Sequence, residues 1–95
     1  MIKKKADITD FLNQFEVIAN NDGAKNFLTF NTKKPKGTLT IMKYPNGQFT
    51  YHRKNELYWD IKEIQISNEI LPDIIWVFRK AINERIKDKL VNITK

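Results

Sequence analysis

The sequence has no cysteine, and it has only three glycines, three prolines and one histidine in 95 residues. Without cysteine the chain cannot form a disulfide scaffold, a thiolate zinc site or a cysteine nucleophile. The single histidine, His52, excludes a metal site with two histidine ligands, and three glycines are too few for a glycine-rich phosphate cradle. P-loop, dinucleotide-binding, HExxH and nucleophile-elbow motifs are also missing. We therefore expect neither a metal nor a cofactor.

Long apolar runs are missing as well. No stretch approaches the roughly 20 apolar residues needed to span a bilayer. The first residues, Met1–Lys5, are basic and are not followed by the apolar region of a signal peptide. A length of 95 residues and an apolar fraction of 41% suit one packed core. We expect a cytoplasmic protein without a membrane partner.

Acidic residues are absent from the window between Gly23 and Asn55. All 11 carboxylates lie outside it, although a solvated surface usually mixes charges of both signs. The basic residues inside the window are Lys25, Lys33, Lys34, Lys36, Lys43, Arg53 and Lys54. This distribution favours a surface that binds nucleic acid or another polyanion, and the alternatives are a role in solubility alone or an acidic protein partner.

The segment 37–54, GTLTIMKYPNGQFTYHRK, predicts a β-hairpin, because two runs rich in Thr, Ile, Phe and Tyr flank a turn sequence. Pro45 presets the backbone of the turn, and Gly47 supplies the positive φ that closes a three-residue loop. Such a loop pairs Tyr44 with Gln48. Alternation then predicts a core face and a wet face with some aromatic and basic character. The core face holds Leu39, Ile41, Lys43, Phe49, Tyr51 and Arg53, and the wet face holds Thr38, Thr40, Met42, Tyr44, Gln48, Thr50, His52 and Lys54.

The flanking segments complete an α+β fold. Residues 7–20 predict an amphipathic helix with Asp7 as its N-cap, although residues 15–20 could instead be a strand. Residues 26–32 predict a strand, and residues 55–67 predict one broken strand or two short ones. The periodicity of residues 68–91 predicts a long C-terminal helix that starts near Leu71 and packs on one face of a three- to four-stranded antiparallel sheet. We expect a basic flexible arm at residues 1–6, a single domain at 7–91 and a frayed terminus at 92–95.

The leading functional hypothesis is a small basic protein that binds nucleic acid without catalysis, with single-stranded DNA or RNA favoured because no element resembles a groove-reading helix. The predicted contacts are Lys33, Lys34, Lys36, Met42, Lys43, Tyr44, His52, Arg53 and Lys54. A second hypothesis is a ribonuclease-like toxin in which His52, beside two cations, acts as a general acid or base. A third is a small inhibitor or adaptor, of the kind that mobile elements encode, for an acidic or nucleic-acid-bearing protein complex.

The C-terminal helix also suggests self-association. Trp76 and Val77 lie outside its main apolar stripe and widen the apolar arc beyond what one sheet face requires. Exposed apolar patches of this kind often mark contacts between proteins. We therefore predict a homodimer through the surface around Trp76.

Overall fold

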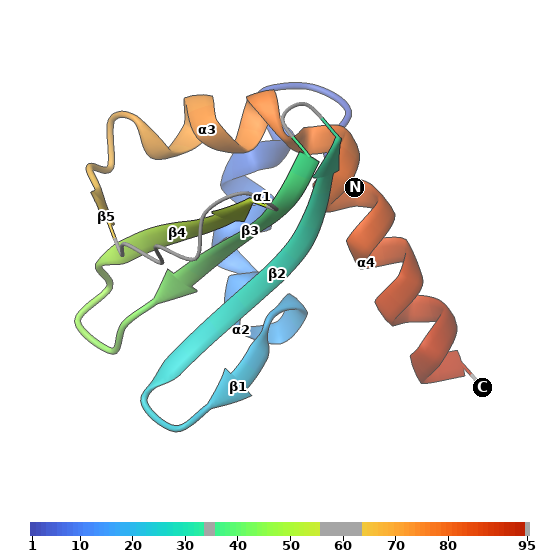
Figure 1. Cartoon of the computed structure of the whole chain (residues 1–95), viewed down its shortest axis with the longest axis horizontal. Coiled ribbons are helices and arrows are strands. Elements are labelled where there is room, and N and C mark those ends of the chain that lie inside the picture. Colours follow the sequence, from blue (N-terminus) through green and yellow to red (C-terminus); the bar gives the residue numbers. More distant parts are fainter. Residues whose placement is uncertain (34–35, 56–63, 95) are drawn as a thin grey trace.

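The computed structural model describes residues 1–33, 36–55 and 64–94, which form an α+β fold around an antiparallel sheet (Figure 1). The five strands follow one another in the sheet in chain order. They are β1 (Asn20–Asp22), β2 (Lys25–Lys33), β3 (Lys36–Lys43), β4 (Phe49–Asn55) and β5 (Ile64–Ile66). The helices α1 (Asp7–Asn13) and α2 (Phe15–Ile18) precede the sheet, and α3 (Leu71–Val77) and α4 (Arg79–Thr94) follow it.

The central hairpin of β3 and β4 has the predicted turn. The N–H of Tyr44 donates to the carbonyl of Gln48 at 2.9 Å, and the N–H of Gly47 donates to the carbonyl of Tyr44 at 2.9 Å. Gly47 has a φ of 88°, a conformation that glycine adopts without strain. The Asn46 side chain accepts a hydrogen bond from the N–H of Gln48 at 2.9 Å, as turn asparagines commonly do. The prediction of a three-residue loop is confirmed.

The prediction of three or four strands is wrong, because the sheet has five strands and β1 adds an edge strand between the predicted helix and β2. The helix predicted for residues 7–20 is interrupted at Gln14 and ends at Ile18, and the alternative of a strand from Phe15 is also wrong. β1 pairs with the start of β2, so that Asp22 is opposite Lys25. Gly23, with a φ of 61°, therefore lies in the hairpin turn between β1 and β2.

The prediction of one long C-terminal helix is also wrong. Phe78, with φ −100° and ψ 15°, interrupts the helical conformation and separates α3 from α4. The Phe78 ring lies 6.1 Å from the ring of Phe30 in β2. After this break α4 lies alongside β2 (Figure 1), where the Arg85 side chain donates to the carbonyl of Thr29 at 3.1 Å. The apolar period predicts the buried side chains of both helices but not the change of axis between them.

The region predicted as a broken strand is described only at its end. β5 pairs with β4, and Ile66 is opposite Phe49. Ile66 is buried, so one of the two short strands expected here is present. The remaining apolar residues of that prediction, Leu57, Trp59 and Ile61, lie outside the described residues.

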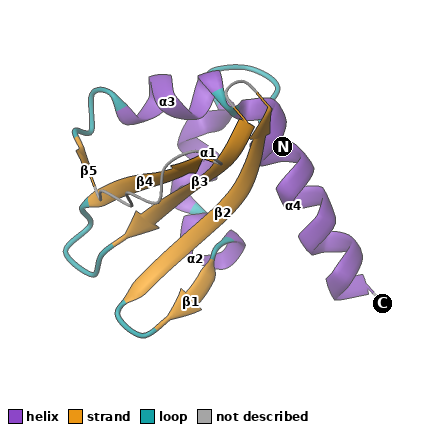
Figure 2. Ribbon diagram, viewed as in Figure 1, coloured by secondary structure: helices purple, strands orange, loops and turns teal. Residues whose placement is uncertain are grey.

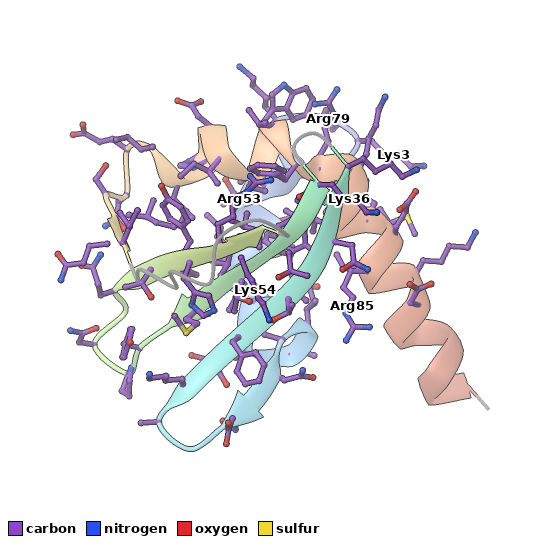
Figure 3. The ribbon with its side chains drawn as sticks, viewed as in Figure 1. Lys3, Lys36, Arg53, Lys54, Arg79 and Arg85 are labelled. Carbon is purple, nitrogen blue, oxygen red and sulfur yellow. The ribbon has the colours of Figure 1, made fainter. Side chains whose placement is uncertain are left out.

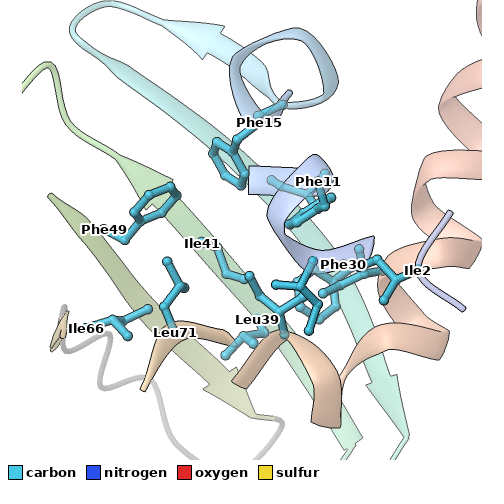
Figure 4. Packing of buried hydrophobic residues seen from close by; sticks show 14 residues of the cluster. Ile2, Phe11, Phe15, Phe30, Leu39, Ile41, Phe49, Ile66 and Leu71 are labelled. Carbon is cyan, nitrogen blue, oxygen red and sulfur yellow. The ribbon is translucent and has the colours of Figure 1, made fainter. Parts of the chain in front are cut away.

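The hydrophobic core lies between one face of the sheet and the helices. Figure 2 shows α1 and α2 behind the sheet and α3 along one end of it. The close view in Figure 4 shows side chains from the N-terminal helices, the sheet and α3 meeting in this core. The fully buried large side chains are Phe15, Leu28, Leu39, Ile41, Ile75 and Ile82. The N-terminal helices therefore contribute to the core together with the C-terminal ones.

The first residues are attached to this core. We expected residues 1–6 to be a flexible arm, but the Ile2 side chain is only 3% exposed. The Ile2 N–H donates to Asn83 Oδ1 at 2.8 Å, and Asn83 Nδ2 donates to the Ile2 carbonyl at 2.8 Å. Asp7 is the first residue of α1 and not its N-cap, which is Ala6. The chain start is thus fixed by a partner 81 residues away.

Candidate nucleic-acid interface

The second face of the sheet, which we call the polar face, is built by the register of three strands. Across the sheet, Asn31 is opposite Thr38, and Thr38 is opposite Lys54. Alternation from this row assigns the other members. The polar face comprises Lys25, Phe27, Thr29, Asn31 and Lys33 of β2, Lys36, Thr38, Thr40 and Met42 of β3, and Thr50, His52 and Lys54 of β4, followed by Tyr44 and Gln48 at the turn. The strands β2, β3 and β4 contain no carboxylate.

The centre of the polar face is buried. Thr40, Met42 and Thr50 are 7%, 6% and 4% exposed. The hydroxyl groups of Thr29 and Thr40 share a hydrogen bond of 2.8 Å across the two strands. The expectation of a continuous wet face is therefore wrong at its centre. Accessible groups gather at the two ends.

We call the end of the polar face where β2 ends and β3 begins the lysine end. It is hollowed, with a volume of about 660 Å³, and its lining includes Asn31, Thr38, Lys33, Lys36 and Lys54. The three lysine side chains are exposed. Lys33 and Lys36 are directly opposite each other in the register, which places two like charges side by side. A phosphate group placed between them would be attracted by both.

The opposite end, which we call the tyrosine end, lies at the β3–β4 turn. A smaller hollow of about 380 Å³ is lined by Tyr44, Asn46, Gln48, Thr50 and Gln65. Gln48 Nε2 donates to the Ile66 carbonyl at 3.0 Å, which ties the turn to β5. The Nζ of Lys25 lies 5.3 Å from the centre of the Tyr44 ring, within cation–π distance. Amide groups and one aromatic ring are suited to hydrogen bonding and stacking with a nucleobase.

The structure separates the predicted contact residues into three groups. Lys33, Lys36, Met42, Tyr44, His52 and Lys54 are on the polar face, although Met42 is buried there. Lys43 and Arg53 are on the helix side, where Lys43 Nζ lies 3.3 Å from a Glu16 carboxylate oxygen and Arg53 donates to the Thr32 hydroxyl at 3.0 Å. Lys34 lies outside the described residues.

Some members of the polar face were missed by sequence reasoning. Lys25 belongs to the acid-free window, yet only the register shows that it reaches the Tyr44 ring. Asn31 joins the lysine end for the same reason, beside Thr38, which the hairpin alternation had placed on this face. The signal for these two β2 residues in the sequence is the alternation of the strand, combined with its pairing register to the hairpin.

His52 is half-buried and is opposite Thr40 in the register. Within residues 1–33, 36–55 and 64–94, no group of three His, Asp or Glu side chains could hold a metal ion. In the same residues, no helix combines the length and the apolar character needed to cross a membrane.

The chain matches no protein-family model, and comparisons with curated proteins and with solved structures give no significant match.

Proposed function

We propose that this protein binds single-stranded nucleic acid without catalysis through the two ends of the polar face. The observation that carries the proposal is the convergence of Lys33, Lys36 and Lys54 on one hollow from three strands that lack carboxylates. Lysines supply point charges for phosphates, and such contacts provide most of the affinity of non-specific nucleic-acid binding.

The spacing of the two ends supports a single strand as the ligand. Lys36 begins β3 and Tyr44 directly follows its last residue. Their separation of eight residues corresponds to about 26 Å at roughly 3.3 Å per residue. A single strand can place a phosphate at the lysine end and an unstacked base at the tyrosine end. A duplex keeps its bases inside, so it would leave Tyr44 and the amides unused.

A binding titration tests this proposal. We expect a labelled 20-nucleotide dT or U oligomer to bind more tightly than a 20-base-pair duplex at equal salt, measured by fluorescence anisotropy. Four to six phosphate contacts should give a log–log salt slope of about −3 to −4 on single strands. An affinity that does not change between 50 and 200 mM NaCl would contradict the proposal and favour an acidic or apolar protein partner.

The RNA arm of the same titration addresses the ribonuclease alternative. We expect the U oligomer to remain intact during incubation with the protein. RNA that is cleaved by the parent, but about 10²–10⁴-fold more slowly by a His52→Gln variant, would replace our proposal with catalysis by His52. The glutamine keeps a hydrogen-bonding side chain of similar size, so a binding role alone would change little.

Self-association through α3 is a separate proposal. Ile70 and Val77 are 55% and 70% exposed, and their spacing of seven residues puts them on one side of the helix, next to Trp76. We expect sedimentation at micromolar concentrations to give twice the monomer mass of 11.3 kDa, and a Val77→Lys variant to sediment as a monomer. A parent protein that remains monomeric across this concentration range would exclude the dimer.

A further inference from the structure

The N-terminal lysines are presented by an ordered turn. The Asp7 carboxylate accepts hydrogen bonds from the N–H groups of Lys3 and Lys4 at 2.9 and 3.0 Å, and these bonds lower the pKa of Asp7. The carboxylate is therefore charged at neutral pH and stays engaged with the backbone. Since Ile2 is also bonded to Asn83, the backbone of this turn is held at both ends. The side chains of Lys3, Lys4 and Lys5 are exposed.

A stacked arginine and tryptophan lie beside this turn. The guanidinium carbon of Arg79 is 4.0 Å from the centre of the Trp76 ring, and Arg79 Nη1 donates to the Trp76 carbonyl at 2.8 Å. The Nζ of Lys5 is 5.9 Å from the same ring. Stacking holds the guanidinium plane in place, so less side-chain entropy is lost when its remaining N–H groups bind an anion. Asp73, one turn earlier on α3, is the exposed carboxylate on this helix.

This cluster and the lysine end lie at the same end of the molecule. The rings of Phe30 and Phe78 are 6.1 Å apart, and Arg79 directly follows Phe78. Lys33 is three residues beyond Phe30 on β2, about 10 Å along the strand, and its side chain lies on the opposite face of the sheet from Phe30. In the view of Figure 3, Lys3, Arg79 and Lys36 are all labelled at this end of the molecule. An extended polyanion at the lysine end would reach the N-terminal turn by passing around the end of the sheet where β2 ends and β3 begins.

We propose that Lys3, Lys4, Lys5 and the Trp76–Arg79 stack form a second phosphate-binding patch that continues the lysine end. This inference rests on the proposed function, because it assigns the patch to the same single strand. The patch would bind backbone phosphates through the lysines and Arg79. Arg79 also bonds the last turn of α3, so a variant at Arg79 would mix binding with stability, and the lysines provide the cleaner test.

The experiment compares Lys3→Gln/Lys5→Gln with Lys87→Gln/Lys89→Gln, which removes the same charge from α4 two turns beyond Arg79. We expect the first variant to bind the dT oligomer about tenfold more weakly at 50 mM NaCl, with a salt slope shallower by about 1.4, because each lost contact on a single strand contributes about 0.7. The control should change the affinity less than twofold. Both variants should keep the thermal midpoint of the parent.

The emission of Trp76 gives a second readout. Trp59→Phe leaves Trp76 as the only tryptophan of the chain. In that background, the emission of Trp76 should change on addition of the oligomer and saturate together with the anisotropy. Emission that stays constant through saturation would place the strand elsewhere and overturn the inference.

The outcomes separate this inference from the proposed function. If the parent binds no oligomer, both fail. If the parent binds and Lys33→Glu/Lys36→Glu weakens it while Lys3→Gln/Lys5→Gln behaves like the α4 control, the second patch alone is wrong. If poly-glutamate displaces the oligomer at equal charge concentration and affects Trp76 equally, the patch serves an acidic protein, and the phosphate assignment is overturned.

Discussion

Replacing Phe15 with alanine is expected to lower the free energy of unfolding by about 3–5 kcal/mol, the usual cost of removing a buried phenylalanine. The Phe15 side chain has no exposed surface. Its ring makes edge-to-face contacts with Phe11 and Phe49, at centroid distances of 5.9 and 5.3 Å. Truncation would leave a cavity between the N-terminal helices and β4 and remove both ring contacts.

The neighbouring Val17 provides the control, because it lies on the same short helix and is 87% exposed. Val17→Ala should change the free energy of unfolding by less than about 0.5 kcal/mol. Urea denaturation monitored by circular dichroism measures both variants. If Phe15→Ala alters the free energy by less than 1 kcal/mol, α2 does not cover the sheet as described. Phe15→Leu, which fills part of the cavity, should lie between the parent and the alanine variant.

The burial of Phe15 could be predicted from the sequence, but its partner could not. The spacing of Ile8, Phe11 and Phe15 marks one side of a helix, and all three side chains are buried. That pattern does not contain Phe49, which is 34 positions further along the chain and meets Phe15 only after the sheet has formed. Periodicity reports which face of an element is buried, whereas tertiary packing decides what covers it.

Elements with local chemistry were predicted more accurately than elements that depend on pairing. The β3–β4 turn follows from Pro45, Asn46 and Gly47, whose own backbone preferences determine it. β1 has no such signal, since all three of its residues are polar and exposed. It is a strand only because β2 offers an edge with which it can pair. The break at Phe78 likewise has no Gly or Pro beside it as a local signal, and it coincides with a ring contact between Phe78 and Phe30 of β2.

The same distinction applies to the candidate interface. Alternation placed Lys54 and His52 on the polar face and Lys43 and Arg53 on the helix side, and the register agrees. Lys43 and Arg53 were predicted to contact nucleic acid only because they are basic residues of the acid-free window. The burial of Met42 could not be predicted, because alternation does not report what surrounds a side chain. The order of the N-terminal turn depends on Asn83, which no local pattern could reveal.

The largest expected effect on binding comes from Lys33→Glu/Lys36→Glu. These residues are directly opposite each other, so both the parent and the variant hold a pair of like charges across the two strands. The repulsion between the two positions is therefore similar in parent and variant, while the sign of the lysine end is reversed. We expect the affinity for the dT oligomer at 50 mM NaCl to fall on the order of 100-fold, because two attractive phosphate contacts become two repulsive ones.

The matched control is Lys87→Glu/Lys89→Glu, which changes the formal net charge of +6 by the same amount on α4. If affinity depended only on net charge, the two variants would lose it equally. A local site instead predicts a loss of less than about fivefold for the control, because none of the described residues that line the hollow at the lysine end belongs to α4. Equal losses in the two variants would show that the protein attracts nucleic acid by its overall charge, and the lysine end would then have no special role.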